Sequence, residues 1–261
     1  MCLSPGSTER IVHMTGDPLR DSLTAAARND TARHARRAVC DALSIGFHRT
    51  GETLRVGGHL FGPQRVDGTS PFGNGDDRLV ALGYLSETAA ALIGGVVKLI
   101  EHDNLYAAAA LNRQLVEVEY LTWAFVEDQE EAASWLRSTR QERLQRWQPR
   151  HLRDRSQGRF RGQDYAEHCE VGGHPTPHGV RALFAAETAT TTEIIMSEAA
   201  NHGTSAWEYL LLAVVVLCHN HNFDPADLIP DEAAKAVGAA EGQWRRHDRL
   251  TAVWQGRSPS A

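Results

Sequence analysis

The sequence lacks the patterns that identify several large protein classes. It has no Walker pattern and no G-x-G-x-x-G after a strand-like segment, so neither common phosphate-binding loop is present. Its four cysteines are scattered without C-x-x-C spacing, which argues against a disulfide framework and against a cysteine-rich zinc site. Convincing alternation of apolar and polar residues, the signature of half-buried strands, is also missing. These absences favour a helical protein of a reducing compartment.

Long apolar runs are also scarce. The longest one, 209–218, is well short of the roughly 18 to 20 residues that span a bilayer, and residues 1–17 contain no apolar stretch typical of a secretory signal. The formal net charge of -6 argues mildly against a protein whose main work is electrostatic binding of nucleic acid, although it allows a local basic patch. We therefore expect a soluble cytoplasmic protein with no membrane partner. A homo-oligomer is compatible with the sequence.

Helix signals dominate what is present and predict one all-α bundle over 18–256, with a flexible N-terminus at 1–17 and a disordered tail at 257–261. The segment 51–75 holds seven glycines and two prolines, so we expect a long loop there, with a short hairpin around 54–60. The expected helices, read from caps and breakers, cover 18–49, 77 to about 102, 105 to about 126, 129–137, 138–149, 179–201, 204–219 and a last one from 225, with a basic connector at 150–162.

The densest group of titratable residues lies at 165–178. Three histidines, one cysteine and two glutamates share this stretch with two glycines and two prolines. Polar side chains on a backbone that must bend sharply suggest a site more than a core. His168, His174 and His178 are candidate metal ligands, since neutral imidazoles beside a thiolate or carboxylate suit zinc or iron. The alternative is that these histidines are rigid turn residues.

Arg113 and Glu117 are four apart, so they share one face of a helix that is otherwise largely apolar. Unpaired charge inside such a helix is costly, so we expect both side chains to be buried and partnered. One interpretation is a structural salt bridge to a neighbouring helix. The other is the polar floor of a pocket in the bundle.

Two further patterns are weaker. Glu198 and His202, also four apart, would suit a carboxylate–histidine pair of a metal-binding bundle. Residues 28–34 fit the Arg-Asn-x-x-x-x-His pattern of HEPN-type ribonucleases, in which Arg28 would hold the scissile phosphate and His34 would move the proton. So short a pattern arises easily by chance in a chain rich in arginine and histidine.

Arg113-x-x-x-Glu117, an acidic helix start at 127–128, and a Tyr165-led helix running into His174 together resemble a group of bacterial all-helical domains often described as HEPN-like. The resemblance covers roughly 79–216. It departs from the usual pattern because Cys169 or His168 stands where a small polar residue is expected. The resemblance implies an all-α fold and a cluster of these four residues, but no established activity and no cofactor.

The resemblance leads to the function that we expect: contact with RNA or a nucleotide in stress or phage defence. His174 would be the acid/base group, Arg113 an anion clamp, Glu117 its orienter and Tyr165 a hydrogen-bond donor. One alternative is a non-catalytic interaction protein in which this cluster only braces the bundle. A second is a carboxylate/histidine metalloenzyme, with ligands drawn from Glu117, His168, His174, Glu198 and His202.

Overall fold

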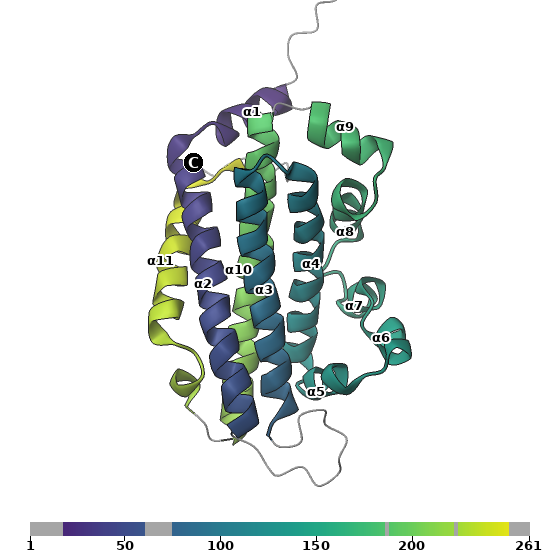
Figure 1. Ribbon diagram of the computed structural model, residues 1–261, viewed down its shortest axis with the longest axis vertical. Helices are drawn as coiled ribbons and strands as arrows, with labels where there is room; N and C mark the ends of the chain where they lie inside the picture. Colours follow the sequence, from purple (N-terminus) through teal and green to yellow (C-terminus); the bar gives the residue numbers. More distant parts are fainter. Residues whose placement is uncertain (1–17, 61–74, 186–187, 222–223, 251–261) are drawn as a thin grey trace, which may run out of the picture.

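The computed structural model describes residues 18–60, 75–185, 188–221 and 224–250. Over these residues the chain is helical and has no strand, so the all-α prediction is confirmed. The long helices run side by side as a bundle, and a series of short helices lines its α4 edge (Figure 1). The long helices are α2 (Asp30–Leu60), α3 (Asp77–Glu101), α4 (Leu105–Glu127), α10 (Thr188–His221) and α11 (Asp231–His247). The shorter elements are α1 (Pro18–Ala27), α5 (Glu130–Arg137), α6 (Arg140–Arg146), α7 (Pro149–Arg155), α8 (Gly162–His168), a π-helical turn (Cys169–Gly173), α9 (Pro177–Ala185) and a 3-10 turn (Pro225–Asp227).

Side-chain caps fix several helix starts where the sequence indicated them. The Asp76 carboxylate accepts the backbone N–H of Arg78 at the start of α3, and the Asn104 side chain accepts that of Ala107 at the start of α4. Helix α6 begins one residue later than expected, because Thr139 rather than Ser138 forms the capping box. Each cap satisfies a backbone donor that has no partner within its own helix.

The expected loop and hairpin at 51–60 are wrong, because α2 continues through Gly51 to Leu60. The glycines serve helix packing here. A Cβ on Gly51 would lie 2.9 Å from the carbonyl oxygen of Gly83, and a Cβ on Gly58 would lie 2.8 Å from the backbone nitrogen of Val80. Only glycine lets α2 and α3 approach this closely. The remainder of the predicted loop, 61–74, lies outside the described residues, as do 1–17 and 257–261.

The predicted helix 18–49 is interrupted at residues 28–29, which separate α1 from α2. Asn29 causes the restart: its side-chain oxygen accepts the backbone N–H of Ala32 and so caps α2. The His34 ring bonds locally as well, with Nδ1 2.7 Å from the Asp30 carbonyl oxygen. Two of the three defined positions of the ribonuclease-like pattern, Asn29 and His34, thus have local roles in building α2.

Two other expected boundaries are also wrong. Helix α10 runs unbroken through Gly203, where a Cβ would come within 3.0 Å of Ile93 and 3.1 Å of Leu43 on neighbouring helices. The basic connector at 150–162 contains helix α7, whose first residue, Pro149, fits the first turn of a helix. Gly203 within α10 and Pro149 at the start of α7 had suggested the opposite.

The core lies between the long helices, and a buried ion-pair network crosses it. Arg36 on α2 is fully buried and bonds Glu193 of α10 at 2.7 Å and Asp248, just after α11, at 2.8 Å. This network ties three helices together at one end of the bundle. By length and composition alone, helix α3 could cross a membrane. Its apolar stretch has a mean hydropathy of 1.6, and 67% of this stretch is buried inside the bundle.

Candidate functional site

Three of the four predicted site residues meet at the α4 edge of the bundle. Arg113 and Glu117 lie one turn apart on α4, and Tyr165 comes from α8. Arg113 Nη2 lies 2.9 Å from Glu117 Oε1 and donates to the Tyr165 hydroxyl at 3.1 Å. That hydroxyl donates in turn to Glu117 Oε1 at 3.0 Å. Two hydrogen bonds and one ion pair therefore join the three side chains in a closed triangle, which we call the Arg–Glu–Tyr triad.

The turn after α8 brings this segment close to α4. Residues Cys169–Gly173 form a π-helical turn, a rare geometry that is frequent at functional sites. A Cβ on Gly172 would lie 2.5 Å from the backbone carbonyl of Ala109, and one on Gly173 would lie 3.2 Å from Arg113 Cδ. Gly172 is needed for the turn to lie directly against the α4 backbone, and Gly173 lies beside the Arg113 side chain.

The expectation of a buried ion pair is wrong. The side chains of Arg113 and Glu117 are 31% and 34% exposed. They lie where the short helices α7 and α8 and the π-helical turn pack on α4, beside Tyr165 of α8. A half-open polar triad matches the floor of a site better than a sealed brace.

The triad fixes the protonation of its members. Partial burial acts to lower the pKa of Arg113, but contacts with Cys169, Glu117 and Tyr165 raise it, so the guanidinium stays charged. Burial and the Glu117 carboxylate raise the pKa of Tyr165 well above its ordinary value. Tyr165 therefore keeps its proton, which suits the predicted role of hydrogen-bond donor.

Arg153 is a neighbour of the triad that the sequence did not reveal. Its guanidinium carbon lies 5.3 Å from the centre of the Tyr165 ring, and that of Arg113 lies 5.7 Å from the same ring. Both distances allow cation–π attraction. The only signal in the sequence was the basic character of 150–162, which does not indicate which arginine reaches Tyr165.

His174 borders the triad without joining its hydrogen bonds. Its backbone N–H donates to the Cys169 carbonyl at 3.3 Å, which closes the π-helical turn, and the residue is exposed. Within the described part of the chain, its side chain forms no hydrogen bond or ion pair. An exposed imidazole at the end of this turn is free to meet a ligand. Its acid/base role stays a prediction.

Three of the weaker metal candidates form a second, buried cluster between α4, α8 and α10. Nε2 of His168 lies 3.1 Å from Nε2 of His202, and His168 Nδ1 lies 3.9 Å from Glu198 Oε2. The carboxylate that holds His202 is Glu119, whose Oε2 lies 2.6 Å from Nδ1. Glu198 was the expected carboxylate partner of His202, and Glu117, a further candidate ligand, is two residues from Glu119 and points to another face of α4.

Burial keeps one of the two histidines neutral. Burial and then the neighbouring His202 lower the pKa of His168 to about 3, so this ring is neutral at ordinary pH. His202 lies between the two partners, with Nδ1 against the Glu119 carboxylate and Nε2 against His168. Over the described ranges, no group of three or more His, Cys, Asp or Glu is placed to hold a metal ion. The side chain of His178 lies outside what the structure describes.

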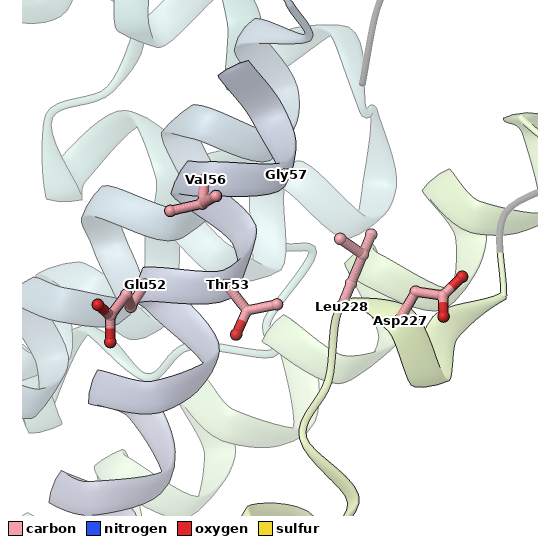
Figure 2. A pocket seen from close by; sticks show the side chains of 6 residues that line it. All are labelled: Glu52, Thr53, Val56, Gly57, Asp227 and Leu228. Carbon is pink, nitrogen blue, oxygen red and sulfur yellow. The ribbon is translucent and has the colours of Figure 1, made fainter. Parts of the chain in front are cut away.

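A shallow pocket of about 280 Å³ lies elsewhere, between α2 and the 3-10 turn (Figure 2). Glu52 and Asp227 contribute carboxylates to its lining, beside Thr53, Val56, Gly57 and Leu228. None of the predicted site residues reaches it. Two carboxylates also make it a poor place for a phosphate.

No protein-family model matches the chain, and comparisons with curated proteins and with solved structures likewise find no match. The functional argument therefore depends on the geometry of the triad and its surroundings.

Proposed function

We propose that this chain is a cytoplasmic, HEPN-like bacterial protein that binds the phosphate of an RNA or a nucleotide at the Arg–Glu–Tyr triad, in stress or phage defence. Arg113 is the anion clamp in this proposal. Glu117 orients it, Tyr165 donates a hydrogen bond, and His174 acts as the acid/base group if the bound ligand is also turned over.

The observation that carries the proposal is a charged guanidinium held in place beside solvent. Glu117 and Tyr165 both contact Nη2 of Arg113, which holds the guanidinium in place while about a third of the side chain stays exposed. A planar guanidinium held in this way suits the oxygen geometry of a phosphate. Arg153 adds a second positive charge beside the triad, because its guanidinium lies over the Tyr165 ring.

Calorimetric titration with AMP, ADP and a 5′-phosphorylated RNA trinucleotide tests the proposal. At least one of these ligands should bind the wild-type protein, and Arg113→Gln should weaken that binding about tenfold or more, as expected for loss of a charged hydrogen bond. Arg37→Gln is the matched control, since Arg37 also forms an i,i+4 ion pair on an exposed helix face, with Asp41. Equal weakening by both substitutions, or no binding of any of the three ligands, would refute the proposal.

The non-catalytic alternative is favoured by a separate observation on α10. Leu212, Val215 and Val216 are 51%, 46% and 38% exposed and share one helix face. An exposed apolar stripe is a common feature of protein interfaces. Sedimentation of the wild type and of Leu212→Ser tests this alternative. If the wild type forms an assembly and the substitution breaks it, the result favours an interaction protein.

Metal analysis of protein purified without chelator tests the metalloenzyme alternative.

A further inference from the structure

Positive charge is concentrated in one short stretch of the chain. Residues 137–161 contain nine arginines and only two carboxylates, Glu142 and Asp154, which gives a formal charge of +7 in a chain whose total is -6. Lysine does not contribute, because Lys98 and Lys235 are the only lysines in the sequence. We call residues 137–161 the arginine arm.

The arginine arm follows the α4 edge of the bundle. It comprises the end of α5, α6, α7 and the segment leading to α8, and it lies on the opposite side from α2 and α11 (Figure 1). Helix α7 packs on α4, and α6 packs on α7. The arm therefore forms one continuous outer surface that ends at the triad, where Arg153 stacks on Tyr165.

Part of this charge is used to build the arm itself. Glu131 is buried and accepts hydrogen bonds from Trp147 Nε1 at 2.9 Å and from Arg155 Nη1 at 3.1 Å, and it also pairs with Arg146. Arg137 lies 3.6 Å from Asp77. The Glu131 contacts fasten α5, the end of α6 and α7 together, and the Arg137 contact ties α5 to α3.

The rest of the charge faces outward. Six arginines of the arm form no ion pair with any carboxylate in the part of the chain that the structure describes: Arg140, Arg143, Arg150, Arg153, Arg159 and Arg161. Five of them are exposed and Arg153 is half-buried. Arg140 and Arg143 share a face of α6, and Arg150 and Arg153 share a face of α7, because each pair is three residues apart. Unneutralised positive charge along one surface raises the local concentration of a polyanion.

We propose that the arginine arm binds the phosphate backbone of a single-stranded nucleic acid and leads that strand to Tyr165. Guanidinium groups bond phosphate oxygens in pairs, which favours a phosphate polymer over a generally acidic surface. A membrane surface fits poorly, since Leu144 is the only large apolar side chain that the arm exposes. The half-buried ring of Tyr165 favours a single strand, because unpaired bases can stack on an aromatic ring and paired bases cannot.

This inference deepens the proposed function, because it names the ligand as a strand rather than a mononucleotide. It rests on the proposed function only for the contact of the strand with Arg113.

Fluorescence anisotropy with a labelled RNA of about 16 nucleotides measures binding of the strand, since single-strand sites cover up to about this length. The variant is Arg150→Gln/Arg153→Gln. The control is Arg49→Gln/Arg246→Gln, which removes the same charge from exposed positions on α2 and α11, away from the arm.

The wild-type protein should bind the strand with an affinity that falls steeply between about 50 and 200 mM salt. Each phosphate contact contributes about 0.7 to the slope of log affinity against log salt, so the arm variant should lose about 1.4 of that slope. At about 0.1 M salt this corresponds to a loss of roughly ten- to thirtyfold, and the control should lose less than about threefold.

Several outcomes would overturn the inference: no strand binding, equal losses in variant and control, or a preference for duplex, polyglutamate or anionic vesicles over the strand. A matching single-stranded DNA tests whether the sugar matters, and binding of either strand supports the arm. Arg113→Gln separates the two proposals. If it abolishes nucleotide binding while the strand still binds the arm with an unchanged salt slope, the triad and the arm act as separate sites. If it changes neither, the proposed function fails and the arm stands alone.

Discussion

Removing the Glu117 carboxylate should destabilise the fold by an amount that reports how open the triad is. Glu117 Oε1 accepts the Tyr165 hydroxyl at 3.0 Å and lies 2.9 Å from Arg113 Nη2. The hydrogen bond contributes about 0.5–1.5 kcal/mol, and an i,i+4 ion pair that is about one-third exposed adds about 0.3–0.5 kcal/mol. Glu117→Ala should therefore cost about 1–2 kcal/mol, well below the roughly 3–5 kcal/mol of a broken buried pair.

Urea unfolding and thermal melting measure this cost. For a domain of this size, about 1–2 kcal/mol corresponds to a fall in melting temperature of roughly 2–8 °C. Gln114→Ala, at an exposed neighbouring position on the same helix, is the control and should change the melting temperature little. Tyr165→Phe and the double variant complete a cycle that isolates the Glu117–Tyr165 coupling, expected at about 0.5–1 kcal/mol. Strict additivity would show that the two side chains do not interact, and a loss above about 3 kcal/mol would show that the triad is sealed.

Four further outcomes follow from the same contacts. Arg36→Gln should cost roughly 3–5 kcal/mol in urea unfolding, because it leaves the buried Asp248 carboxylate without its cation and Glu193 with only the half-exposed Arg33; a loss below about 1 kcal/mol would contradict this. The pKa of His168 is lowered to about 3 in the folded protein, whereas the unfolded chain takes up this proton near pH 6.5. The free energy of unfolding should therefore fall as the pH decreases from about 6.5 to about 3, by up to about 1.4 kcal/mol per pH unit. His168→Gln should lack this pH-dependent component. Gly172→Ala should lower the melting temperature, since its Cβ would lie 2.5 Å from a backbone carbonyl, while Gly162→Ala, with nothing within 4 Å, should not. His174→Ala should keep the wild-type melting temperature by circular dichroism, because the residue is exposed, and should abolish any turnover and any cellular phenotype of the wild-type gene; a stable, fully active variant would remove His174 from the site.

Local signals in the sequence predicted much of the fold. Asp76 and Asn104 indicated the starts of α3 and α4, because capping depends on residues close together in the chain. Gly51 and Gly203 were misleading for the opposite reason. Their role is contact with neighbouring helices, at Gly83 and at Ile93, and that contact exists only once the bundle has formed.

The candidate site was predictable in its residues and not in its surroundings. The four-residue spacing of Arg113 and Glu117 and the later Tyr165 were visible as a pattern, and the structure places these residues together. Their exposure was not predictable, since it depends on which short helices cover α4. The pairing of His202 with Glu119 likewise depends on the rotation of α4 against α10, which apolar periodicity alone did not fix.

The most direct test of the account is photochemical cross-linking of the full chain to a uridine-rich RNA strand, with the attached residues located by mass spectrometry. If RNA phosphate is held at the triad and along the arginine arm, the cross-links should fall at Tyr165, Cys169 or residues within 137–161, and Arg113→Gln should reduce those at Tyr165 and Cys169. Cross-links confined to α2 or α11, or an unchanged pattern in Arg113→Gln, would contradict the proposed site.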